Sequence, residues 1–241
     1  MSFLGLEWVE THVMAKAAPS DFFRNDLSSR DRQDLQSIRV IRLAEMLHNL
    51  QYTSGFAKVL QVLKSDSVEA SYAELEVAKL LAWKGQPFRF VTPRGVRGED
   101  YDLEILVNGQ IVCADTKCKL ETTPRTDQTL YETLREGRKS VPPDKPGILF
   151  VKLPQTWIDT FDDSAQILER VCKRYFSNTG RIVSVKFYFQ LTMSESDGVG
   201  SIYMSKEYDN PRARHASAAN WTMLQDMQPS PDWLDLVTVC E

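Results

Sequence analysis

The sequence predicts an α/β protein, because helical and strand-like patterns follow one another along its 241 residues. Residues 68–84 have the apolar spacing of a packed helix. The dipeptide Asn108-Gly109 separates two alternating runs, the strongest local signal for a β-hairpin. Gly147–Leu153 is a short, continuous apolar run, as expected of a central buried strand.

Helical patterns dominate the first third of the chain. Residues 1–25 show no regular pattern, so little regular structure is expected there. Apolar residues then recur at roughly helical spacing behind the candidate N-caps Ser28 and Ser29. The helices expected here cover about residues 28–49, 54–63 and 68–84.

Strands and helices alternate in the remaining chain. The expected strands are residues 88–91, the hairpin strands 99–107 and 110–119, and then 147–153, 181–192 and 200–205. Helices are expected over about 126–138 and 161–176, and a polar loop over Ser194–Gly198. We assign no element to the tail that contains Trp221 and Trp233.

The hairpin pattern also predicts a strand register. If Asn108 and Gly109 form a two-residue loop, Val107 faces Gln110, and the numbers of opposed residues sum to 217. One face of the hairpin is then apolar and should pack into a core. Its members are Tyr101, Leu103, Ile105, Val107, Val112, Ala114, Thr116 and Cys118.

The other hairpin face carries an unusual pair of acids. In this register Asp102 lies opposite Asp115, and Asp100 lies opposite Lys117. Opposed side chains are about 4.5–5.5 Å apart at Cβ, and like charges at that spacing are destabilising. Such a pair is tolerated when a cation lies between the acids or when one is protonated. A metal-dependent hydrolytic site is therefore the leading hypothesis, and an amphipathic hairpin with a solvated outer face is the alternative.

Three segments in order resemble the PD-(D/E)XK nuclease superfamily. They are the helix Ala73–Gly85, a strand carrying Asp102, and a strand carrying Asp115-Thr-Lys117. Tyr101 stands where the literal motif has proline. The resemblance covers roughly residues 71–154. It implies a restriction-endonuclease-like αβββαβ core, with a mixed β-sheet flanked by helices. The nuclease-like core, with a C-terminal β extension, would cover residues 67–241, and an N-terminal helical extension residues 1–66.

The resemblance also implies roles for the site residues. Glu74 is expected to supply a third carboxylate, with Glu76 as the alternate, since the two lie about 200° apart on a helix. Asp102, Asp115 and Glu74 would hold Mg²⁺, or Mn²⁺, which lowers the pKa of a bound water. Lys117 would orient or deprotonate that water or stabilise developing negative charge. A salt bridge to Asp100 is the alternative role for this lysine.

The composition is that of a soluble globular protein, with 42% hydrophobic and 26% charged residues. We read no bilayer-spanning apolar run and no signal peptide, so a cytoplasmic protein without a membrane partner is expected. The four cysteines lack CxxC spacing, which favours free thiols over disulfides. The three scattered histidines argue against a zinc site.

The charge pattern bears on the substrate. A net charge of −4 is mild evidence against a nucleic-acid binder. Two segments are nevertheless basic, Lys84–Gly98 and Ser164–Gln190, and could flank a phosphate path. The expected function is a Mg²⁺-dependent nuclease that hydrolyses phosphodiester bonds of nucleic acid, with DNA favoured. The alternative is a catalytically idle nuclease-fold protein that binds a protein or nucleic acid. A homodimer is left open.

Overall fold

The structure, a computed structural model, describes residues 3–15, 22–23, 30–65, 68–96, 98–157, 161–195, 198–215 and 230–236. These residues form an α/β fold around an open, mixed sheet of six strands in the order β1-β2-β3-β4-β5-β6. The strands are β1 Phe88–Phe90, β2 Leu103–Val107, β3 Gln110–Cys118, β4 Gly147–Lys152, β5 Ile182–Glu195 and β6 Gly198–Asp209. The pairs β3–β4 and β4–β5 are parallel, and the other neighbouring pairs are antiparallel.

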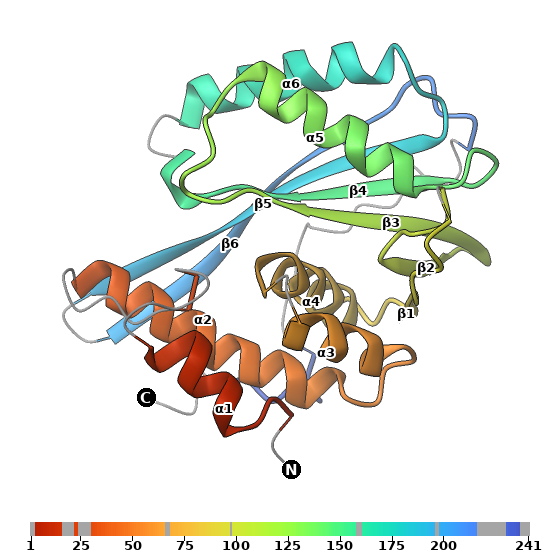
Figure 1. Cartoon of the computed structure of the whole chain (residues 1–241). Helices are drawn as coiled ribbons and strands as arrows, with labels where there is room; N and C mark the ends of the chain where they lie inside the picture. Colours follow the sequence, from red (N-terminus) through yellow and green to blue (C-terminus); the bar gives the residue numbers. More distant parts are fainter. Residues whose placement is uncertain are drawn as a thin grey trace.

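Helices cover both faces of this sheet (Figure 1). On one face lie α5 and α6, and on the other lie the N-terminal helices and α4. The helices are α1 Leu6–Val9, the π-helix η1 Glu10–Met14, α2 Arg30–Leu50, α3 Phe56–Ser65, α4 Val68–Trp83, α5 Asp127–Ser140, the 3-10 helix η2 Gln155–Trp157 and α6 Phe161–Phe176. Alternate residues of each central strand face the two layers. Ile148 and Phe150 of β4 therefore join the core on the α4 side, while Leu149 and Val151 join the core under α5.

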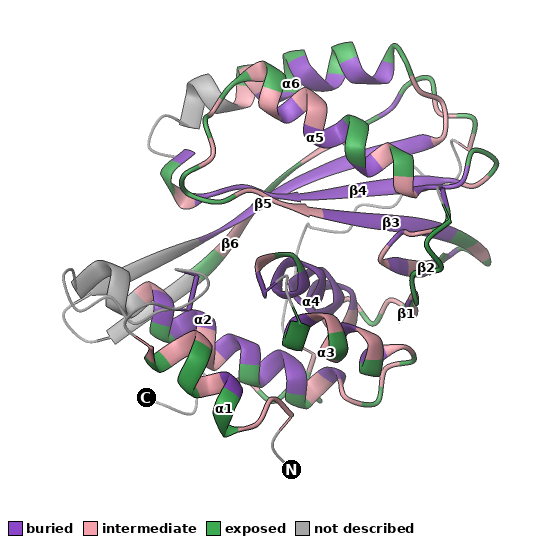
Figure 2. Cartoon of the chain, in the orientation of Figure 1, coloured by how far each residue is buried: buried purple, intermediate pink, exposed green. Residues whose placement is uncertain are grey.

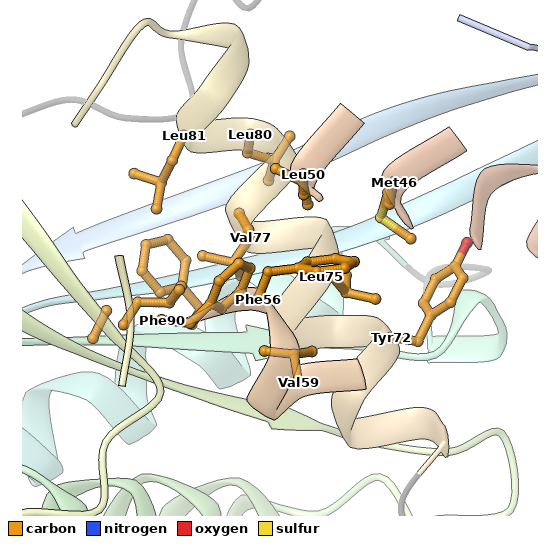
Figure 3. Close-up of a cluster of buried hydrophobic side chains, with 14 of the residues drawn as sticks. Met46, Leu50, Phe56, Val59, Tyr72, Leu75, Val77, Leu80, Leu81 and Phe90 are labelled. Atoms are coloured by element: carbon orange, nitrogen blue, oxygen red, sulfur yellow. The ribbon is translucent and has the colours of Figure 1, made fainter. Parts of the chain in front are cut away.

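The helix α4 is the centre of the larger core. Figure 2 shows it buried along its length, and Figure 3 shows side chains of α2, α3 and β1 gathered around it. Leu75, Val77, Leu80 and Leu81 are fully inaccessible. A helix that is apolar on most sides is expected to be enclosed on most sides. The polar exceptions on α4, Glu74, Glu76 and Lys79, therefore need partners or a function.

The predicted hairpin is present with the predicted register. Asn108 has φ 50° and Gly109 has φ 79°, as a two-residue type I′ turn requires. The ladder pairs Val107 with Gln110 and runs to Leu103 with Ala114, so each numbered pair sums to 217. The face predicted to be apolar is buried from Leu103 to Val107 and at Val112 and Ala114.

Some sequence predictions were wrong. Residues 1–25 contain α1 and η1, because Trp8 is buried there and its indole N–H donates to the Leu63 carbonyl at 3.2 Å. The predicted polar loop Ser194–Gly198 is shorter, because the β5–β6 ladder continues through its ends to the pair Glu195–Gly198. In the tail, Trp233 is buried, whereas Trp221, like Ser28 and Ser29, lies outside the described residues.

The cysteines in the described part of the chain, Cys113, Cys118 and Cys172, are free thiols. Cys240 lies outside it. Across the same described ranges, no helix is both long and apolar enough to cross a bilayer.

Candidate functional site

The candidate site lies where β2 leaves β3. The β2–β3 ladder ends at Leu103 and Ala114, whereas β3 continues beside β4 as far as the pair Cys118–Lys152. Asp102 directly precedes β2, and its backbone N–H donates to the Ala114 carbonyl at 2.9 Å. The Asp102 carboxylate then accepts from the Thr116 N–H at 2.6 Å. A side chain therefore caps the exposed edge of β3, where a neighbouring strand would otherwise supply a carbonyl.

Asp115 lies in the middle of β3 and faces α5. It pairs in register with Leu149 and is only 1% exposed. Gly137 of α5 makes room for it, since a Cβ there would lie 3.0 Å from Asp115 Oδ2. The same oxygen lies 2.7 Å from Lys117 Nζ, in an ion pair that lacks the angles of a hydrogen bond. Lys117 is 30% exposed in its side chain and so connects this buried acid with solvent.

The two glutamates of α4 point to different surroundings. Glu74 is influenced electrostatically by Asp102 and Asp115 and pairs with Lys58, whose Nζ is 3.6 Å from Glu74 Oε1. Glu76 points away and pairs with Lys152 at 2.6 Å. The structure thus brings Glu74, and not Glu76, towards the two aspartates.

Electrostatics in this cluster favour the protonated acids. Burial, followed by the charge of Asp102, raises the pKa of Glu74 to about 8 and that of Asp115 to about 7. Burial also raises the pKa of Asp102, against the opposing effect of Lys117. Burial alone would lower the pKa of Lys117, but Asp115 and Asp102 raise it overall. Three acids share two lysines here, so the cluster would gain from further positive charge.

The predicted contacts beyond Leu103 were wrong in detail. Asp100 does not pair with Lys117, because its carboxylate accepts from the Arg94 and Gly95 N–H groups at 2.8 and 3.1 Å. The chain turns away at Asp102, so the summing rule fails from that residue onward. Asp102 comes close enough to influence Asp115 electrostatically through its hydrogen bond to the Thr116 N–H, and not as a directly opposed ladder pair.

Sequence reasoning missed Lys58. Lys58 lies on α3, whereas Glu74 lies on the following helix, α4. Lys58 reaches the site because α3 packs on α4 and β1. A lysine on an amphipathic helix carries no local signal of such a contact, so only the tertiary arrangement could reveal it.

The site has the donor chemistry for a hard cation. Glu74 Oε1 is buried and has no hydrogen-bond partner among the described residues. The acids around it would offer carboxylate oxygens as ligands, which Mg²⁺ prefers. Within the described residues, however, no group of three or more His, Cys, Asp or Glu side chains has the geometry to hold a metal ion. Mg²⁺ commonly takes only one or two carboxylates together with waters and substrate phosphate, so the residues fit such a partly hydrated ion.

The two basic segments are largely paired. Arg89 binds Glu104 and Arg94 lies 3.7 Å from Glu99, while Arg97 is outside the described residues. In the second segment the ion pairs are Arg170–Asp127, Lys173–Glu169 and Lys186–Glu207. The expected phosphate path therefore gains no support from these pairs.

In comparisons with known proteins, the chain matches no family model and no curated protein sequence.

Proposed function

We propose that the chain is a metal-dependent nuclease of the PD-(D/E)XK type, with a restriction-endonuclease-like αβββαβ core formed by α4, β1, β2, β3, α5 and β4. The observation that carries this proposal is that Glu74, Asp102 and Asp115, from three separate parts of the chain, influence one another electrostatically, with Lys117 Nζ 2.7 Å from Asp115. Nucleic acid, with DNA favoured, is the proposed substrate, and Mg²⁺ or Mn²⁺ the proposed cofactor.

The roles of the residues follow from their positions. Asp102 and Asp115, with Glu74, would hold the cation, which supplies a Lewis acid for the phosphate and an acidified water. Thr116 N–H orients the Asp102 carboxylate through its 2.6 Å hydrogen bond. Lys117 lies 2.7 Å from Asp115, and its side chain is 30% exposed. There it can orient the attacking water or stabilise negative charge that develops on the phosphate.

The idle binding module remains the second candidate, and one observation favours it. Lys117 and Lys58 already pair with Asp115 and Glu74, as they would in a purely structural cluster. Fold alone does not distinguish an active enzyme from such a module.

Digestion of plasmid and single-stranded DNA in Mg²⁺, Mn²⁺ and EDTA separates the two candidates. If the chain is a nuclease, the wild type should cleave DNA with metal and not in EDTA. Asp102→Asn should not cleave in either condition. Glu132→Gln is the matched control, because Glu132 is a half-buried α5 acid paired with Arg135 outside the acidic cluster. Equal, metal-independent results for wild type and Asp102→Asn would favour the idle module.

A further inference from the structure

Lys58 is held in place by an unusually close approach of backbone. The Phe90 N–H of β1 donates to the Ser54 carbonyl at 2.9 Å, just before α3 begins. At the next residue, Gly55, φ is +84° and a Cβ would lie 2.3 Å from the Phe90 carbonyl oxygen. Only glycine fits there without displacing the backbone. The first turn of α3, which contains Lys58, is therefore fixed against the sheet beside the candidate site.

The ion pair that Lys58 makes with Glu74 is buried but loose. The two side chains are 12% and 7% exposed, and their charged atoms are 3.6 Å apart. That spacing exceeds hydrogen-bond length, so within the described part of the chain Glu74 Oε1 has no hydrogen-bond partner. By contrast, Lys152 lies 2.6 Å from Glu76 on the same helix. Lys58 thus neutralises part of the charge of Glu74 without donating a hydrogen bond to its carboxylate.

The charge of Lys58 reaches beyond Glu74. It opposes the rise in pKa at both Glu74 and Asp102, so it acts on two of the three acids. A divalent cation at those acids would be repelled by a lysine at this position and would need the same Glu74 oxygen. Two cations that need one buried carboxylate compete for it.

We propose that Lys58 is the built-in counterion of the acidic cluster and competes with the divalent cation for Glu74. The inference rests on the proposed function, since it assumes that the cluster binds a metal. A bound metal would then take the place of Lys58 at Glu74. Lys58 therefore lowers the affinity of the site for metal in the absence of nucleic acid.

Mn²⁺ binding tests this competition directly. Lys58→Met keeps the length of the side chain and removes its charge, so Mn²⁺ should bind about tenfold more tightly, a factor modest for a partly buried charge pair. Lys64→Met is the matched control, because Lys64 is an exposed lysine in the last turn of the same helix. The readout is isothermal titration calorimetry of the intact chain without nucleic acid, so no activity is needed.

The outcomes separate the inference from the function. Unchanged or weaker Mn²⁺ binding by Lys58→Met, with wild-type binding intact, overturns the competition and leaves the nuclease proposal standing. Failure of the wild type to bind Mn²⁺ removes both. If Lys58→Met does not fold, Lys58→Gln is measured in its place with the same expectation. A double-mutant cycle of Lys58→Met with Glu74→Gln, measured by the free energy of unfolding, should show coupling between the two residues in EDTA. The coupling should disappear in saturating Mn²⁺.

Discussion

The helix α4 presents two buried glutamates to opposite sides, and their surroundings differ. Both oxygens of Glu76 accept hydrogen bonds, from Lys152 Nζ at 2.6 Å and from the Tyr203 hydroxyl at 3.2 Å. Glu74 has a 3.6 Å ion pair with Lys58, and its Oε1 has no hydrogen-bond partner in the ranges that the structure describes. A buried charge with a full set of partners can be explained by folding alone. A buried charge with too few partners, next to two more acids, is not explained by folding alone, and the proposed metal site depends on this feature.

The largest effect on stability should come from the Glu76 side of α4. Lys152→Met leaves the carboxylate of Glu76, which is 0% exposed, without its charged partner. Loss of one partner of a buried pair costs about 3–5 kcal/mol of unfolding free energy. Urea denaturation should show this loss equally in EDTA and in Mg²⁺, whereas the exposed Lys139→Met should change little. A negligible loss in Lys152→Met would mean that Glu76 is not held by this pair.

On the Glu74 side, the largest effect should be on catalysis. Lys117→Ala removes a half-buried ammonium group that touches Asp115, and we expect cleavage to fall by at least about a hundredfold. The fold and metal binding should be nearly intact, because the lysine is not a proposed ligand. Rates of plasmid cleavage with Mg²⁺ measure the change. A variant that cleaves as well as the wild type would show that Lys117 is only a partner of Asp115.

Neutralising an acid should have opposite effects on stability in the acidic cluster beside Glu74 and in the Glu76–Lys152 pair. In EDTA, Asp115→Asn should be at least as stable as the wild type, because it removes repulsion with Asp102 while Lys117, 30% exposed, can turn to water. Glu76→Gln should be clearly destabilised, because it leaves Lys152 buried without its acid. Denaturation of both variants in EDTA provides the comparison. A clear loss of stability in Asp115→Asn would favour a structural role for the cluster.

The hairpin was predictable from sequence for a physical reason. The φ values above zero that a type I′ turn requires select Asn-Gly, and this turn sets the register that brings β2 and β3 together. The turn of the chain at Asp102 was not predictable, because the Asp102 carboxylate accepts from the Thr116 N–H, a contact that no local sequence pattern encodes. Lys58 and the enclosure of Asp115 by Gly137 depend on helix packing between distant segments, which no local pattern encodes.

The acidic cluster should also make the stability of the fold depend on pH. The pKa of Asp115 rises from 3.8 to about 7 on folding, and that of Glu74 from 4.5 to about 8. Between about pH 4 and pH 8 the folded protein therefore binds more protons than the unfolded chain. The free energy of unfolding in EDTA should fall as the pH rises through this range. The double variant Glu74→Gln/Asp115→Asn should flatten this slope. Asp127→Asn should not, because folding lowers the pKa of Asp127 and its contribution changes at more acidic pH. An unchanged slope in the double variant would contradict the assignment.

Metal-dependent thermal stability tests the central claim, that Asp102 and Asp115 share a divalent cation, most directly. Millimolar Mg²⁺ or Mn²⁺ should raise the melting temperature of the wild type by several degrees, since a bound ligand stabilises the folded state, and about 2–4 °C corresponds to 1 kcal/mol in a chain of this size. Asp102→Asn should show no rise, while Glu132→Gln should respond as the wild type does. A wild-type melting curve that is the same in millimolar metal and in EDTA would contradict the metal site.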